Sequence, residues 1–190
     1  MTINYNKSIS LLIISLSLLT VAKAQNKNAS IIAGATATQI HGDGMAGYNK
    51  LGMEFGISVE SPLSDKILFQ PELLYFQKGS SSNADTPFFL KFKLNYLELP
   101  LMFGYNLNDF FQLQAGPSIG YLLNGEVSSA LNARSLSDVN KIDASLMAGG
   151  SYRFLANTSV KIRYSISFLS ITKTGNSVND TVSFLLIFHI

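Results

Sequence analysis

The sequence predicts an all-β protein, an eight-stranded antiparallel up-and-down transmembrane β-barrel. Three observations lead to this prediction. Apolar and polar residues alternate with a period of two in segment after segment, which is typical of strands with two different faces. Short and long connections between these segments follow each other in strict order, as in bacterial outer-membrane barrels. Past residue 30, no run is apolar for long enough to form a transmembrane helix.

The first residues have the composition of a signal peptide. Lys7 gives a short positive region, an apolar run follows from Ile9 to Val21, and Ala22-Lys23-Ala24 has the small-x-small pattern of a cleavage site. An N-terminal membrane anchor is the alternative, but the run is short for the roughly 20 apolar residues that a span needs. We therefore expect a signal peptide, 1–24, followed by a barrel domain, 25–190. Because no cysteine follows the cleavage site, lipoprotein attachment is not expected.

The composition excludes several classes of function. Removal of the signal peptide removes two of the 14 basic residues, and the 12 that remain balance 12 acidic ones. A neutral chain without Lys/Arg clusters gives no electrostatic case for binding nucleic acid. The chain has no cysteine, which rules out disulfides and thiol chemistry. Its two histidines, His41 and His189, are far apart in the sequence, so neither a metal nor another cofactor is expected.

Eight segments carry the strand pattern. In the clearest of them, Ser159–Ser170, Val160 and Ile162 fall on one face and Lys161 and Arg163 on the other. In chain order, the expected strands are 29–40, 50–60, 67–78, 88–106, 110–123, 141–154, 159–170 and 182–190.

The fourth expected strand changes parity near Asn95-Tyr96. A β-bulge adds one residue to a strand and thereby swaps the faces of the residues that follow. We therefore expect a bulge at this point of the strand 88–106.

The connections between the strands alternate in length. The short ones are turn-like and span 61–66, 106–109 and 155–158. The long ones are rich in Ser, Asn, Gly and Asp and span 41–49, 79–87, 124–140 and 171–180. In outer-membrane barrels the short turns lie in the periplasm and the long links lie outside the cell. The first and last strands should therefore begin and end in the periplasm.

Aromatic residues gather near both expected ends of the barrel, as they do at the two interfaces of a membrane. Near the periplasmic end we expect Phe69, Phe103, Tyr105, Phe110, Phe111, Tyr152, Phe154 and Phe188. Near the external end we expect Tyr48, Tyr75, Phe88, Phe89, Phe92, Tyr121 and Phe168. The chain has no Trp, so Tyr and Phe must form both girdles.

A soluble, lipocalin-like periplasmic barrel that binds an apolar ligand is the alternative, since its strands alternate as well. In that fold the apolar residues point inward. Two features favour the membrane barrel. The apolar face is large and aromatic, whereas the opposite face has Gly and Ser, which fit a narrow interior. The mean hydropathy is +0.23, and only 14% of residues are charged.

Three motifs resemble the PorT-like outer-membrane β-barrel family of Bacteroidota. The stretch 62–75, PLSDKILFQPELLY, is similar to that family's second hairpin. LNYLELPL, 94–101, is similar to its fourth strand, and AGPSIGYLL, 115–123, to its fifth. The resemblance implies an outer-membrane barrel. Most members have no assigned activity, and the founding member's link to protein secretion does not transfer by fold.

The polar face carries charges of both signs. These are Glu54, Glu60, Glu72 and Glu98 from the second to fourth strands, and Arg153, Lys161 and Arg163 from the sixth and seventh. An eight-stranded barrel is only wide enough for its own side chains, so these groups should meet. We expect a structural ion-pair network that fills the lumen, formed by Glu54, Glu72, Glu98, Arg153, Lys161 and Arg163. In it, Glu72 or Glu98 should pair across the lumen with Arg153 or Arg163. A gated polar pore or a proton path is the alternative.

Together these features favour a non-enzymatic outer-membrane barrel. Its partners would be outer-membrane lipid and, through external links such as 124–140, another envelope protein or a target outside the cell. An outer-membrane lipid-modifying enzyme is the alternative. It would use His41, which lies with Asp43 in a Gly-rich link, together with a nearby Ser, although no spacing motif indicates a catalytic triad.

Overall fold

The computed structural model describes residues 28–42, 47–82, 90–129, 133–135, 139–172 and 177–190. The expected signal peptide, 1–24, lies outside these residues. Within the described part of the chain, no helix has the length and apolar character that a membrane crossing requires.

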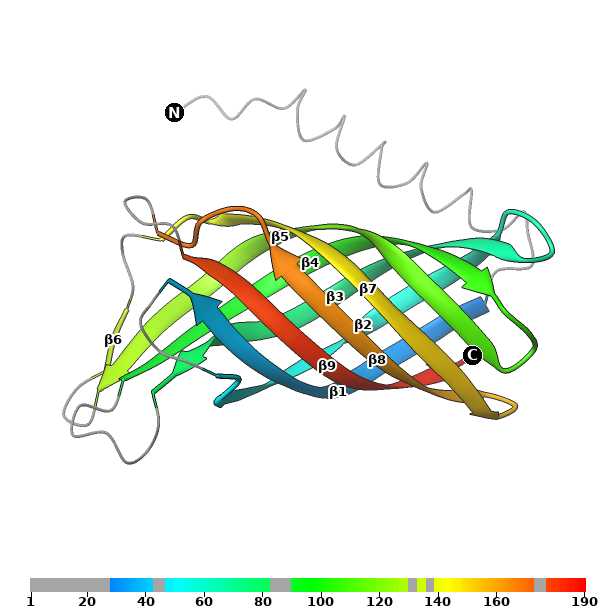
Figure 1. Ribbon diagram of the computed structural model, residues 1–190, viewed down its shortest axis with the longest axis horizontal. Helices are drawn as coiled ribbons and strands as arrows, with labels where there is room; N and C mark the ends of the chain where they lie inside the picture. Colours follow the sequence, from blue (N-terminus) through cyan, green and yellow to red (C-terminus); the bar gives the residue numbers. More distant parts are fainter. Residues whose placement is uncertain (1–27, 43–46, 83–89, 130–132, 136–138, 173–176) are drawn as a thin grey trace, which may run out of the picture.

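The described residues form nine strands in one antiparallel sheet (Figure 1). The eight long strands correspond to the eight expected ones. They are β1 (Asn28–His41), β2 (Lys50–Pro62), β3 (Ile67–Ser81), β4 (Leu90–Asn106), β5 (Phe111–Ser129), β7 (Ile142–Leu155), β8 (Thr158–Ser167) and β9 (Val178–His189). The three-residue strand β6 (Ala133–Ser135) was not expected and pairs with the end of β5.

The sheet closes because the first strand pairs with the last. Ile31 of β1 lies opposite Phe188 of β9, and Ala35 lies opposite Phe184. Each long strand otherwise pairs with its neighbours in the chain, which makes the topology up-and-down. A closed sheet has no free edge, so its backbone groups are satisfied internally, as a membrane requires. The predicted fold class is confirmed.

The short connections lie at one end of the barrel, and the strand ends that the long links join lie at the other (Figure 1). At one end, which we call the turn end, the chain reverses within a few residues. There Leu63 N donates to Ile67 O at 2.8 Å, and Leu107 N donates to Phe111 O at 2.9 Å. The start of β1 and the C-terminal residue also lie at this end. The strand ends that the long links join, such as the end of β1 and the start of β2, lie at the other end, the loop end, so the expected alternation is confirmed.

The two faces of the wall differ as predicted. Ile162 and Phe184 point outward, and more than half of each side chain is exposed. Lys161 and Arg163 flank Ile162 in the sequence, and both point inward and are buried. Apolar residues outside and polar residues inside are the reverse of the arrangement in a soluble barrel. The structure therefore does not support the lipocalin-like alternative.

The register between β4 and β5 shifts at the expected point. Asn95 lies opposite Asn124, but Tyr96 lies opposite Leu122, so Leu123 is the extra residue. The location of the bulge is confirmed, whereas the strand that carries the extra residue is β5 rather than β4. The faces swap on β5, where Leu122 is buried and both Leu123 and Asn124 are exposed.

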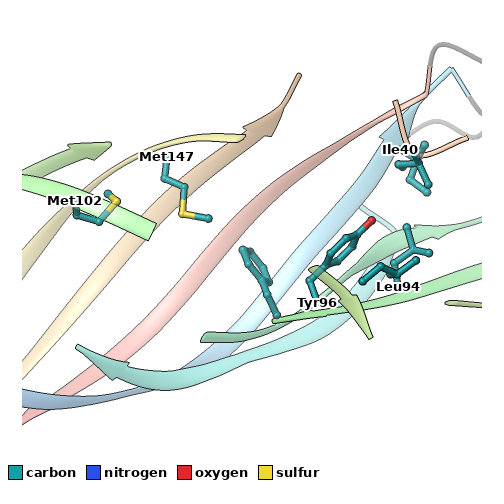
Figure 2. Packing of buried hydrophobic residues seen from close by; sticks show 8 residues of the cluster. Ile40, Leu94, Tyr96, Met102 and Met147 are labelled. Carbon is teal, nitrogen blue, oxygen red and sulfur yellow. The ribbon is translucent and has the colours of Figure 1, made fainter. Parts of the chain in front are cut away.

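The same parity of residues faces inward along β4. The sequence pattern changes because the inward-facing residues become apolar toward the loop end. Leu94, Tyr96 and Glu98 all point inward and are buried. Figure 2 shows residues of the apolar cluster to which Leu94 and Tyr96 belong. Its members are Ile40, Phe76, Leu94, Tyr96, Met102, Leu122, Met147 and Ile171, with Phe92 and Val139 packed against them. Sequence alternation alone does not distinguish an apolar residue inside this cluster from one that faces lipid.

Most of the expected aromatic girdles lie on the outer surface. At the turn end, Phe111 packs on Tyr152 with ring centroids 4.7 Å apart, and Phe69 packs on Phe103 at 5.2 Å. The exposed aromatic side chains there are Phe103, Tyr105, Phe110, Phe111, Tyr152, Phe154 and Phe188. Toward the loop end, Tyr48, Tyr121 and Phe168 are exposed. Phe92 lies near the loop end of β4 as expected, but it does not belong to the outer girdle, because it packs against the inner cluster. Phe88 and Phe89 lie outside the described residues.

Candidate functional site

Arg163 is the centre of the polar interior. It lies on the inward face of β8, and its guanidinium reaches two strands on the other side of the lumen. Nη1 donates to Glu54 Oε1 of β2 at 2.6 Å, and Nη2 donates to both Glu72 carboxylate oxygens of β3, at 2.8 and 2.6 Å. Ser183 of β9 donates to the second oxygen of Glu54 at 2.6 Å. One buried cation therefore pairs with both carboxylates.

A layer of amides continues this cluster toward the turn end. Lys161 Nζ lies 3.5 Å from Glu72 Oε1 and donates to the side-chain oxygen of Gln114. Gln114 donates to Gln70, and Gln70 Nε2 donates to Glu72 Oε1 at 3.3 Å. These contacts join β3, β5 and β8 and hold Lys161 against the Arg163 cluster.

A second ion cluster lies nearer the loop end. Lys78 of β3 pairs with Glu98 of β4, and its Nζ lies 3.0 Å from Asp143 Oδ2 of β7. Ser118 donates to Glu98 Oε2 at 3.3 Å, and Ser167 donates to Asp143 Oδ2 at 2.8 Å. One lysine thus binds carboxylates from two walls of the barrel.

Lys78 also connects this cluster with the apolar one. Its Nζ lies 4.8 Å from the centroid of the Phe76 ring and 5.3 Å from that of Tyr96. Both distances are within the range of cation–π contacts. The ion pairs and the aromatic rings therefore form one continuous filling of the lumen.

The structure brings together five of the six residues that the sequence predicted for the network, in two groups. Glu54, Glu72, Lys161 and Arg163 form one group, and Glu98 belongs to the other. The expected place of Arg153 in the network is wrong. Arg153 is exposed near the turn end of β7, and no described carboxylate lies within ion-pair distance of it.

The sequence reasoning missed Lys78, Gln70 and Gln114. Lys78 follows Glu72 by six residues and therefore lies on the same inward face of β3. That parity could have identified it, although it lies at the very end of the expected strand. Asp143 lies on the inward face of β7, and the sequence did not identify it as a member of the network either.

Lys50 differs from the other buried cations. Its side chain is 1% exposed, yet its Nζ has no hydrogen-bond partner among the described residues. The charges that act on it most strongly are those of Lys91 and Lys93. A buried ammonium without an acceptor costs free energy, and no contact among the described residues offsets that cost for Lys50.

A third polar cluster lies on the outer face near the loop end. His41 Nε2 lies 2.9 Å from Asp180 Oδ2, and Gln39 Nε2 donates to the same oxygen at 3.2 Å. The hydroxyls of Tyr48 and Tyr164 also bond to Asp180, which is buried beneath these side chains. Burial and the nearby Asp180 carboxylate both raise the pKa of the Tyr48 hydroxyl. The cluster connects the loop ends of β1, β8 and β9 with the segment before β2.

The described part of the chain contains no group of three or more His, Cys, Asp or Glu side chains that could hold a metal ion.

The fold and these contacts agree with the family comparison. The family model described as the outer membrane protein beta-barrel domain matches residues 7–173. The chain belongs to this family. Membership of this family assigns the protein to the outer membrane. The closed sheet and its apolar outer face agree with that location. No curated protein matches its sequence.

Solved structures of outer-membrane proteins share the fold of this β-barrel. One is Ail, the attachment invasion locus protein of Yersinia pestis. It superposes with a TM-score of 0.57 at 15% identity, over 87% of this chain and 100% of Ail. Another is Neisserial surface protein A, with a TM-score of 0.55 at 13% identity, over 86% of this chain and 97% of that one. At these identities the likeness shows the fold alone.

Proposed function

We propose that this protein is a non-enzymatic, non-conducting barrel that holds its external links, 124–140 above all, at the cell surface. Those links would contact another envelope protein or a target outside the cell, while outer-membrane lipid surrounds the apolar belt. The filling of the lumen is the observation that carries the proposal. Arg163 and Lys78 bind carboxylates across the lumen, and an apolar cluster packs among these ion pairs and extends to the loop end.

This filling opposes ion conduction for a physical reason. An ion that crossed the lumen would have to displace Arg163 from Glu54 and Glu72, and then pass the apolar cluster without water. Breaking a buried ion pair costs about 3–5 kcal/mol, because the remaining charge is left without a partner. A barrel of eight strands has no second path beside its own side chains.

Planar-bilayer recordings test this proposal. Purified protein should show no stable conductance steps under conditions in which a trimeric porin, as a positive control, conducts steadily. Large and reproducible channels would contradict the proposal and favour a gated pore.

A lipid-modifying enzyme is the second candidate, because the His41–Asp180 contact is on the outer face near the loop end. The bonds from Gln39, Tyr48 and Tyr164 support a structural role for Asp180 instead. Mass spectra of lipid A from cells with and without the protein distinguish the two. Identical spectra are expected. A modified lipid A that disappears with His41→Ala would favour the enzyme.

The three sequence motifs that resemble PorT-like proteins support a place within that group of Bacteroidota. This narrower kinship is part of the proposal, as is cleavage of the signal peptide after Ala24. Mass spectrometry of the mature protein tests the cleavage, and a first residue of Gln25 is expected.

A further inference from the structure

The turn end opens into a polar cavity of about 470 Å³. Charged and amide side chains surround it, among them Glu60, Asn106, Gln112, Arg153 and His189. Binding sites for small molecules commonly have volumes of about 300–1,000 Å³. The cavity is therefore large enough for a ligand of the size of a short peptide.

Two opposite charges line this cavity without pairing. Glu60 is at the end of β2 and is 9% exposed, and Arg153 is near the end of β7 and is exposed. No ion pair within 4.0 Å joins them in the described part of the chain, although Arg153 and Lys161 are the cations that act on Glu60. Both groups line the same cavity and have no ion-pair partner among the described residues, so both can act on one ligand.

Other side chains that line the cavity are held by hydrogen bonds. His189 Nδ1 lies 3.0 Å from Ser30 Oγ, and its Nε2 lies 2.9 Å from Ser159 Oγ. Gln112 Nε2 donates to Asn106 Oδ1 at 2.9 Å. A wall that is already ordered loses little freedom when a ligand binds. Because both nitrogens of His189 are engaged, its ring serves as part of the wall.

The rim of the cavity adds charges of both signs, with Asp65 and Asp109 opposed by Lys66. A ligand with only negative charge would meet Glu60 and the two rim carboxylates. A ligand with only positive charge would meet Arg153 and Lys66. A ligand that carries both charges close together satisfies both sets.

We propose that this cavity binds the zwitterionic part of an amino acid or short peptide, with its ammonium group at Glu60 and its carboxylate at Arg153. A guanidinium binds a carboxylate through two parallel hydrogen bonds, which makes Arg153 suited to this role. The turn end faces the periplasm in this family of barrels. The ligand therefore comes from periplasmic peptides or from the peptide stems of the cell wall, which share the same chemistry.

Isothermal titration calorimetry on the full-length barrel in detergent tests the proposal. The probes are dialanine, N-acetyl-dialanine, which lacks the ammonium group, and dialanine amide, which lacks the carboxylate. Dialanine should bind, and each blocked peptide should bind at least about tenfold more weakly, as expected for the loss of one charge-assisted hydrogen bond. Absence of dialanine binding, or equal binding of all three peptides, would overturn the proposal.

Two variants assign the two charges. Glu60→Gln should remove the preference for the free ammonium group, and Arg153→Gln should remove the preference for the free carboxylate. Glu126→Gln and Lys141→Gln are matched controls, since both residues are exposed near the loop end, and they should bind as the parent does. Heat-modifiability on a gel shows that each variant is folded. Because Arg153 is exposed, its variant tests the site even if Glu60→Gln does not fold. Unchanged preferences in Arg153→Gln would contradict the proposal.

The source of the ligand is tested with soluble cell-wall fragments that carry intact peptide stems. Tighter binding of these fragments than of dialanine would assign the site to the cell wall, and weaker binding would assign it to free peptides. Both results support recognition of a zwitterion. Binding of neither probe contradicts it.

Discussion

Arg163 Nη2 lies 2.6 Å from Glu72 Oε2 across the lumen, and both side chains are buried. Because water solvates neither charge, the contribution of each residue to the stability of the barrel depends on the other. The same guanidinium also binds Glu54. Through these two ion pairs, Arg163 connects β8 with β2 and β3 across the interior, in addition to the hydrogen bonds within the sheet.

The outward face of β8 should tolerate no charge. Ile162→Arg is expected to destabilise the inserted barrel by about 2–4 kcal/mol if position 162 is near the midplane, because its side chain faces lipid. Ser165→Arg should instead disturb the packing of the lumen, since Ser165 points inward. Nitroxide labels along positions 160–168 measure the alternation. Equal accessibility of odd and even positions to a lipid-soluble quencher would contradict the assignment of the faces.

The two buried lysines near the loop end should respond in opposite ways to the same substitution. Lys78→Met leaves Glu98 and Asp143 without their cation and should destabilise by about 3–5 kcal/mol. Lys50→Met removes an ammonium that has no described acceptor and should be neutral or stabilise by about 1–3 kcal/mol. Urea unfolding in lipid, followed by circular dichroism, gives both values. A similar loss in both variants would show that Lys50 has an acceptor.

The faces of the strands were predictable because alternation reports which residues share a face. Two features were not predictable from it. The apolar cluster around Leu94 and Tyr96 resembles a lipid-facing pattern, since alternation says nothing about what covers a face. The partners of Glu98 depend on the stagger of strands that are not neighbours in sequence. That stagger brings Lys78 and not Arg153 to Glu98.

Gly79 should not tolerate a side chain. Its φ is +134°, and a Cβ there would lie 2.1 Å from the carbonyl oxygen of Phe92. Gly79→Ala is therefore expected to destabilise by about 1–3 kcal/mol through backbone strain, and by more if β4 must move. Gly150→Ala is the control, because the nearest atom to its Cβ would be 3.5 Å away in the Leu113 side chain. Equal stabilities of the two variants would contradict this account of Gly79.

A double-mutant cycle on Glu72 and Arg163 tests most directly whether paired charges fill the lumen. Glu72→Gln and Arg163→Met should each destabilise by about 3–5 kcal/mol, because each leaves a buried charge without its full set of partners. The double variant should lose less than the sum of the two, as expected for groups in direct contact. The same cycle on Glu98 and Arg163, which form no ion pair within 4.0 Å, should give a smaller coupling. Strict additivity for Glu72 and Arg163 would contradict the account and indicate a wetter interior in which these charges are separately solvated.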